Sequence, residues 1–140
     1  MSAGAAVAVA AVFVWLGMVL AISFLEAPLK FRAPGVTTPL GLGIGRLVFR
    51  ALNGCEVVLA VAGLTALLVA GGSGAPLVGV GAACALLAAQ LVFVRPALAR
   101  RSEEVLSGSD GSRSRAHHGY VMLEVFKVVA LLVAGILLLA

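Results

Sequence analysis

Charged residues are scarce in this chain, whereas apolar residues are abundant. Asp, Glu, Lys and Arg make up 11% of its 140 residues, 62% are apolar, and the mean hydropathy is +1.17. Soluble globular domains have about 25% charged and about 45–50% apolar residues, so this composition excludes them. A membrane-spanning helix needs about 20 mainly apolar residues. The chain, residues 1–140, therefore has room for four spans with short connections in a single integral membrane domain.

The motifs of common catalytic sites are also lacking. The sequence contains no nucleophile elbow, no His-Glu-x-x-His and no Cys-x-x-Cys, so we predict that the protein is not an enzyme. Cys55 and Cys84 fall inside apolar segments, where buried free thiols are more common than disulfides. The net charge of +4 does not indicate a nucleic-acid partner, because the basic residues flank apolar segments and form no free cationic face.

Four apolar segments predict an all-α fold, a four-helix transmembrane bundle. The predicted spans are about 5–25, 51–70, 76–94 and 120–140, and the basic connections are 26–50 and 95–119. The first apolar run is longer than the core of a signal peptide, so we expect a retained helix. Thr38 followed by Pro39 is typical of a helix start, with Thr as N-cap.

The distribution of basic residues predicts the orientation of the bundle. Outside the spans, Lys and Arg occur only in the first and third connections. These residues are Lys30, Arg32, Arg46, Arg50, Arg95, Arg100, Arg101, Arg113 and Arg115. By the positive-inside rule, both basic connections face the cytoplasm and both termini lie on the non-cytoplasmic side.

The stretch 22–35, ISFLEAPLKFRAPG, marks the end of the first span. Glu26 and Lys30 are four residues apart in the favourable order for an intrahelical ion pair. Pro28 lies between them and removes a helical donor, so a helix leaving the membrane there is expected to bend or stop.

Polar residues inside the spans are costly and usually face protein or trapped water. Measured inward from the basic boundary along an ideal helix, Glu56 and Glu124 lie roughly 9 Å deep and Gln90 roughly 7.5 Å deep. On the last span, Glu124 and Lys127 share one helix face with His117 and Tyr120, because the spacings are three, four and three. Lys127 can pair with Glu124 locally or with Glu56 across the bundle.

These positions predict a polar cluster that faces the cytoplasm and binds a ligand or ion. Its candidate residues are Glu26, Lys30, Arg46, Arg50, Asn53, Glu56, Gln90, His117, Tyr120, Glu124 and Lys127. Desolvated carboxylates and histidines suit proton exchange. The alternative is that the charged pairs only fasten the helices together. No metal site is predicted, because the adjacent histidines, His117 and His118, point about 100° apart on a helix.

As a function we favour a small transporter-like or ligand-binding protein of the lipid bilayer, with no cofactor identified. The alternative is a non-catalytic accessory or assembly subunit of a larger membrane complex. Four short spans enclose little space alone, so we expect either a homo-oligomer or such a complex.

The segment ISFLEAPLKFRAPG, continuing as LGLGIGRLVFRALN, resembles a group of small bacterial proteins with four transmembrane helices. More distantly, VWLGMVLAISFLEAPLKFR is similar to a superfamily that includes a human four-span protein linked to platinum-drug resistance. Its helical arrangement resembles that of bacterial copper-resistance membrane proteins. The resemblance implies a four-span bundle in a bacterial inner membrane, without an established activity. It does not imply copper export, because Met1, Met18 and Met122 do not cluster.

Overall fold

The protein, described by a computed structural model, is a bundle of long helices. The structure describes residues 1–106 and 115–140, and for 101–102, 104–106 and 115–118 it describes the backbone only. This part of the chain forms helices and no strands. Four of its helices are long and apolar enough to cross a membrane: Ala3–Lys30, Thr38–Val69, Ala75–Arg100 and Gly119–Leu139. The predicted all-α, four-helix transmembrane bundle is therefore confirmed, and the chain is a multi-pass membrane protein.

The helices are divided into shorter elements where the backbone geometry changes. In chain order these elements are α1 (Ala3–Val19), the π-helical segment η1 (Leu20–Glu26), α2 (Ala27–Lys30), α3 (Thr38–Val69), α4 (Ala75–Ala89), the π-helical segment η2 (Gln90–Val94), α5 (Arg95–Leu106) and α6 (Arg115–Leu139). The first span thus combines α1, η1 and α2, and the third combines α4, η2 and the start of α5.

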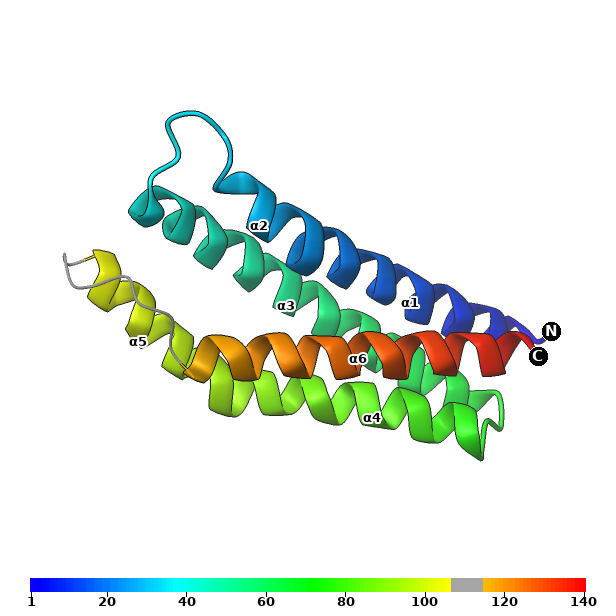
Figure 1. The fold of residues 1–140 in the computed structure, drawn as a ribbon. Coiled ribbons are helices and arrows are strands. Elements are labelled where there is room, and N and C mark those ends of the chain that lie inside the picture. The colour runs from blue at the N-terminus through cyan, green and yellow to red at the C-terminus, as the bar shows by residue number, and fades with distance from the viewer. Residues whose placement is uncertain (107–114) are drawn as a thin grey trace.

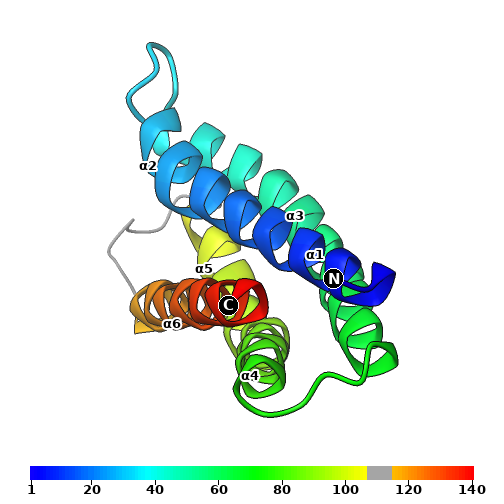
Figure 2. The same ribbon diagram turned by 90° about the vertical axis from the view of Figure 1, so that its right-hand side faces the viewer.

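The two ends of the bundle differ in charge. Both termini and the turn between α3 and α4 lie at one end, whereas α2, the start of α3 and α5 lie at the other (Figure 1). We call the second the basic end, because it carries Lys30, Arg46, Arg50 and Arg95, and the first the neutral end. Viewed toward the neutral end, α1 runs beside α3, and α6 lies beside α4 (Figure 2).

Both π-helical segments precede a proline. A proline has no N–H, and its ring clashes with the carbonyl four residues earlier in an α-helix. Before Pro28, the Ala27 N–H bonds to the Ile22 carbonyl, and before Pro96, the Arg95 N–H bonds to the Gln90 carbonyl. These wider, five-residue turns let the helix pass each proline instead of stopping at it.

The start of α3 differs slightly from the prediction. The N-cap is Thr37 rather than Thr38, and its Oγ1 accepts a hydrogen bond of 3.3 Å from the Leu40 N–H. Pro39 is the second helical residue, where a missing N–H costs little. From this cap α3 runs unbroken for 32 residues, about 48 Å, so its first turns extend beyond a hydrocarbon core of about 30 Å.

Small residues bring the helices close together in the neutral half. A Cβ added at Gly79 of α4 would lie 2.9 Å from the Cβ of Ala134 of α6, so these helices touch at their backbones. Around this contact the core contains Val12, Val80 and Leu131, all essentially buried. With no large driving force between apolar helices in lipid, such close packing is a main source of association. The neutral half is therefore filled by apolar side chains.

Candidate functional site

The centre of the bundle holds a buried ammonium group surrounded by three oxygen atoms. Lys127 Nζ lies 2.5 Å from Glu56 Oε1, 2.5 Å from Glu124 Oε1 and 2.7 Å from Gln90 Oε1. Gln90 Nε2 also donates a 2.8 Å hydrogen bond to Glu124 Oε1. An ammonium has three donors, so all of its hydrogen-bonding capacity is used. We call these four residues, which are at most 1% exposed, the buried cluster.

Two side chains of the first span form hydrogen bonds with the buried cluster, and neither was among the predicted site residues. The indole N–H of Trp15, on α1, donates a 2.9 Å hydrogen bond to Glu56 Oε1. The hydroxyl of Ser23, on η1, donates a 2.5 Å hydrogen bond to Glu124 Oε2. Every membrane-spanning helix therefore contributes at least one side chain to a continuous network.

The buried cluster has more carboxylates than cations. Glu56 and Glu124 face a single ammonium, so the cluster carries a formal charge of −1 when all three groups are ionised. A buried charge without a partner costs several kcal/mol, which one further proton or a monovalent cation would offset. Glu56 Oε2 is buried and has no hydrogen-bond partner among the described residues. A proton on this oxygen would therefore neutralise the buried cluster.

The buried cluster lies deep in the bundle when measured from the neutral end. Glu56 precedes the end of α3 at Val69 by thirteen residues, and Lys127 precedes the end of α6 at Leu139 by twelve. At 1.5 Å per residue these separations are about 20 Å and 18 Å. The apolar core occupies that distance, whereas the opposite side of the cluster faces the basic end.

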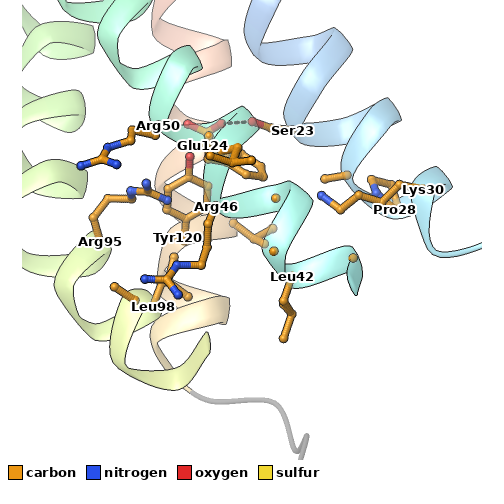
Figure 3. A pocket seen from close by; sticks show the side chains of 18 of the residues that line it. Ser23, Pro28, Lys30, Leu42, Arg46, Arg50, Arg95, Leu98, Tyr120 and Glu124 are labelled. Carbon is orange, nitrogen blue, oxygen red and sulfur yellow. Dashed lines mark hydrogen bonds between the residues drawn. The ribbon is translucent and has the colours of Figure 1, made fainter. Parts of the chain in front are cut away.

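A cavity of about 1200 Å³ connects the basic end with the buried cluster. Glu124 and Ser23 line its inner part, and Figure 3 shows the hydrogen bond between them. Exposed side chains such as Arg50 and Phe24 also line it, so the cavity is open to the surroundings. Its walls come from η1, α2, α3, η2, α5 and α6.

Four basic residues line this cavity: Lys30, Arg46, Arg50 and Arg95. Figure 3 shows the three arginines gathered on one side of the cavity and Lys30 on the other. Arg46 forms an exposed ion pair of 3.5 Å with Glu103. Among the described side chains, neither Arg50 nor Arg95 has a carboxylate within 4.0 Å.

Lys30 reaches into the cavity over the surface of α3. Its ammonium lies 3.9 Å from Glu26 Oε2 and 5.7 Å from the centre of the Phe49 ring. A Cβ added at Gly45 would lie 3.0 Å from Lys30 Nζ, so this glycine makes the room that the lysine occupies. Phe49 in turn packs edge-on against Tyr120, with the ring centres 5.7 Å apart.

Nine of the eleven predicted site residues fall into two groups, and Asn53 and His117 belong to neither. Glu56, Gln90, Glu124 and Lys127 form the buried cluster, with Lys127 pairing both locally and across the bundle. The residues of the cavity and its mouth are Lys30, Arg46, Arg50 and Tyr120, with Glu26 paired to Lys30. Asn53 and Tyr120 are buried, and Asn53 Oδ1 and the Tyr120 hydroxyl have no hydrogen-bond partner among the described residues. His117 and His118 lie outside the described side chains.

Three residues of the site were missed as candidates: Trp15, Ser23 and Arg95. Trp15 offers a usable signal in the sequence, because tryptophan is enriched at membrane interfaces and this one lies in the middle of a span. Ser23 gave little signal, because a lone serine in an apolar helix is common. Arg95 was interpreted only as a topology residue, although it lies five residues after Gln90.

Among the described residues, no group of three or more His, Cys, Asp or Glu side chains is placed to hold a metal ion. No protein-family model, no curated protein and no solved structure matches this chain. The resemblance carried by ISFLEAPLKFRAPG therefore stays a prediction, and the function has to be argued from the site itself.

Proposed function

We propose that this chain is a small transporter-like membrane protein that binds a ligand or ion from its basic end. The observation that carries the proposal is the continuity between the open cavity and the buried cluster through Glu124. In membrane proteins, ionisable residues inside the spans are rare and costly, and they commonly mark the paths of ions, protons or substrates.

The site is open toward one end of the bundle and closed toward the other, as in one state of a transporter that works by alternating access. From the basic end, the cavity reaches Glu124. Beyond the buried cluster, about 18–20 Å of packed apolar side chains separate it from the neutral end. A ligand arriving from the basic end would meet the cavity first. A proton or a monovalent cation at Glu56 Oε2 would then neutralise the buried cluster.

The same proposal assigns a location in the cell. With the positive-inside rule, the basic end lies in the cytoplasm and both termini lie outside. The resemblance of 22–35 to bacterial sequences supports the inner membrane of a bacterial cell. The cavity would then take its ligand from the cytoplasm or from the inner leaflet.

Native mass spectrometry of the protein extracted gently from its own membrane, with elemental analysis of the same sample, tests this proposal. We expect the wild-type protein to retain a small molecule or ion that is lost in Glu124→Gln. Arg32→Gln is the control, because Arg32 is an exposed charged residue at the same end, lies outside the ion pairs of the site and does not line the cavity. Retention of the ligand by Glu124→Gln at the wild-type level would contradict the proposal.

A second candidate function is that of an accessory subunit in a larger membrane complex. It is favoured by the fact that every membrane-spanning helix contributes to the network, as helix fasteners would. In that case the extracted protein would carry a stoichiometric partner protein and no ligand. Glu124→Gln would then lower the abundance of the chain or its association with the partner.

A further inference from the structure

The basic residues at the mouth of the bundle are not distributed like simple topology signals. A topology signal needs only to lie near the membrane surface. Lys30, Arg46, Arg50 and Arg95 instead line one cavity, whereas Arg32 and Arg100 are exposed and do not line it. The cavity therefore gathers cations from α2, α3 and α5, which are separated in the chain.

Carboxylates match only part of this positive charge, because Glu26 pairs with Lys30 and Glu103 pairs with Arg46. Glu124 is the acidic residue that lines the cavity, and it already accepts hydrogen bonds from Ser23 and Gln90 and pairs with Lys127. Arg50 and Arg95 have no carboxylate partner among the described side chains. Like charges in a partly desolvated space repel, so an anion in the cavity would relieve a real cost.

We propose that this cavity binds the phosphate group of an anionic ligand, with Arg50 and Arg95 as its principal contacts. The planar guanidinium group donates paired hydrogen bonds that fit the oxygens of a phosphate. Lys30 and Arg46 add positive charge from the opposite wall and the rim. The inference rests on the proposed function and names the class of its ligand.

The rest of the lining indicates that the phosphate is part of an ester with an apolar portion. Phe24, Leu47, Leu91 and Leu98 line the same cavity. Its volume of about 1200 Å³ is large for a free inorganic ion and exceeds the range of about 300–1,000 Å³ typical of small-molecule sites. A phosphate ester that is soluble and a lipid with a phosphate headgroup share this chemistry.

Binding to the purified full-length protein in neutral detergent tests the inference. The probes are phosphatidic acid, glycerol 3-phosphate and inorganic phosphate, with phosphatidylcholine as the zwitterionic comparison, and bound ligand is counted by native mass spectrometry. We expect Arg50→Gln combined with Arg95→Gln to weaken binding at least about tenfold, as expected for the loss of charge-assisted hydrogen bonds. Arg32→Gln combined with Arg100→Gln removes the same charge outside the cavity and should leave binding within about twofold.

Comparing the lipid probe with the soluble probes distinguishes a lipid headgroup from a soluble phosphate ester as the ligand. Binding of phosphatidic acid without competition from the soluble probes supports a lipid headgroup. Binding of glycerol 3-phosphate, alone or in competition with the lipid, supports a soluble ester. If the double variant fails to fold by circular dichroism, Arg50→Lys combined with Arg95→Lys keeps the charge, loses the paired hydrogen bonds and should show an intermediate affinity.

The inference is overturned if no phosphate probe binds, or if both pairs of arginine variants weaken binding equally. Its failure can be distinguished from failure of the proposed function. If the protein binds no phosphate probe but retains a native ligand that Glu124→Gln removes, the proposed function is supported and the phosphate inference is refuted. If the protein retains no ligand from its own membrane and binds no phosphate probe, both the proposed function and the phosphate inference are refuted.

Discussion

Lys127 Nζ lies 2.5 Å from Glu56 Oε1, and both side chains are fully removed from solvent. The pair connects α6 to α3 in the middle of the bundle. A buried ion pair contributes little net stability relative to a well-packed apolar pair, but removing one partner alone leaves a buried charge that is very costly. The pair therefore fixes how these two helices are rotated and aligned.

Replacing the buried ammonium should destabilise the fold strongly. Lys127→Met keeps a long apolar stem but leaves Glu56 and Glu124 as two carboxylates without a cation. We expect the free energy of unfolding to fall by about 3–5 kcal/mol, measured by denaturant unfolding in detergent micelles with circular dichroism. Adding Glu56→Gln and Glu124→Gln to Lys127→Met should recover most of the loss, since no uncompensated charge then remains. A triple variant no more stable than Lys127→Met would contradict this explanation.

The hydroxyl of Ser23 should matter more than its small size suggests. Ser23→Ala removes the donor to Glu124 Oε2, and we expect a loss of about 1–3 kcal/mol in the free energy of unfolding. Ser23→Thr keeps the hydroxyl and should stay closer to the wild type. Equal stability of Ser23→Ala and wild type, in the same unfolding assay, would show that the hydrogen bond contributes nothing.

The contact between α4 and α6 can be tested with two glycines of the same helix. Gly79→Ala places a methyl group 2.9 Å from the Ala134 Cβ, whereas a Cβ at Gly81 meets no atom within 4 Å. We expect Gly79→Ala to lower the free energy of unfolding by about 1–3 kcal/mol through overpacking. Gly81→Ala should be neutral or stabilising by up to about 1 kcal/mol, because alanine favours helix. The reverse order of stabilities would refute this packing.

The orientation of the bundle can be tested by labelling single cysteines in intact cells, after Cys55 and Cys84 are replaced by alanine. Ser73→Cys lies in the exposed turn at the neutral end, and Ala33→Cys lies in the exposed connection at the basic end. We expect a membrane-impermeant thiol reagent to label Ser73→Cys from outside, and Ala33→Cys only after permeabilisation. The opposite pattern would reverse the assigned orientation.

The buried cluster was largely predictable from the sequence because depth along a helix can be counted in residues. Counting residues inward from the basic boundary placed Glu56, Gln90 and Glu124 at one depth. The separation of three residues between Glu124 and Lys127 placed these two side chains on the same helix face. The sequence did not decide whether Lys127 pairs with Glu56 or with Glu124, because spacing gives the depth of a residue but not the rotation of one helix against another.

The remaining parts of the site depend on irregular backbone. Ser23 and Gln90 both lie in π-helical segments, which shift the register of side chains relative to an ideal α-helix. A count of residues therefore gave the depth of Gln90, but an ideal helix of 3.6 residues per turn does not give the direction of its side chain or of that of Ser23. The cavity could not be predicted from the sequence either. An arginine at a membrane boundary has the same sequence context whether it faces the solvent or lines a cavity, as Arg95 does.

Trp15 gives the protein an optical reporter of its own centre. It is the only tryptophan in the chain, and its indole N–H touches Glu56. The emission of an indole depends on its hydrogen bond and on the charges beside it. Any change in the protonation, ion content or geometry of the buried cluster should therefore alter the fluorescence of the unlabelled protein. The events at its least accessible carboxylate can then be followed in real time, in detergent or in lipid, without introducing a probe.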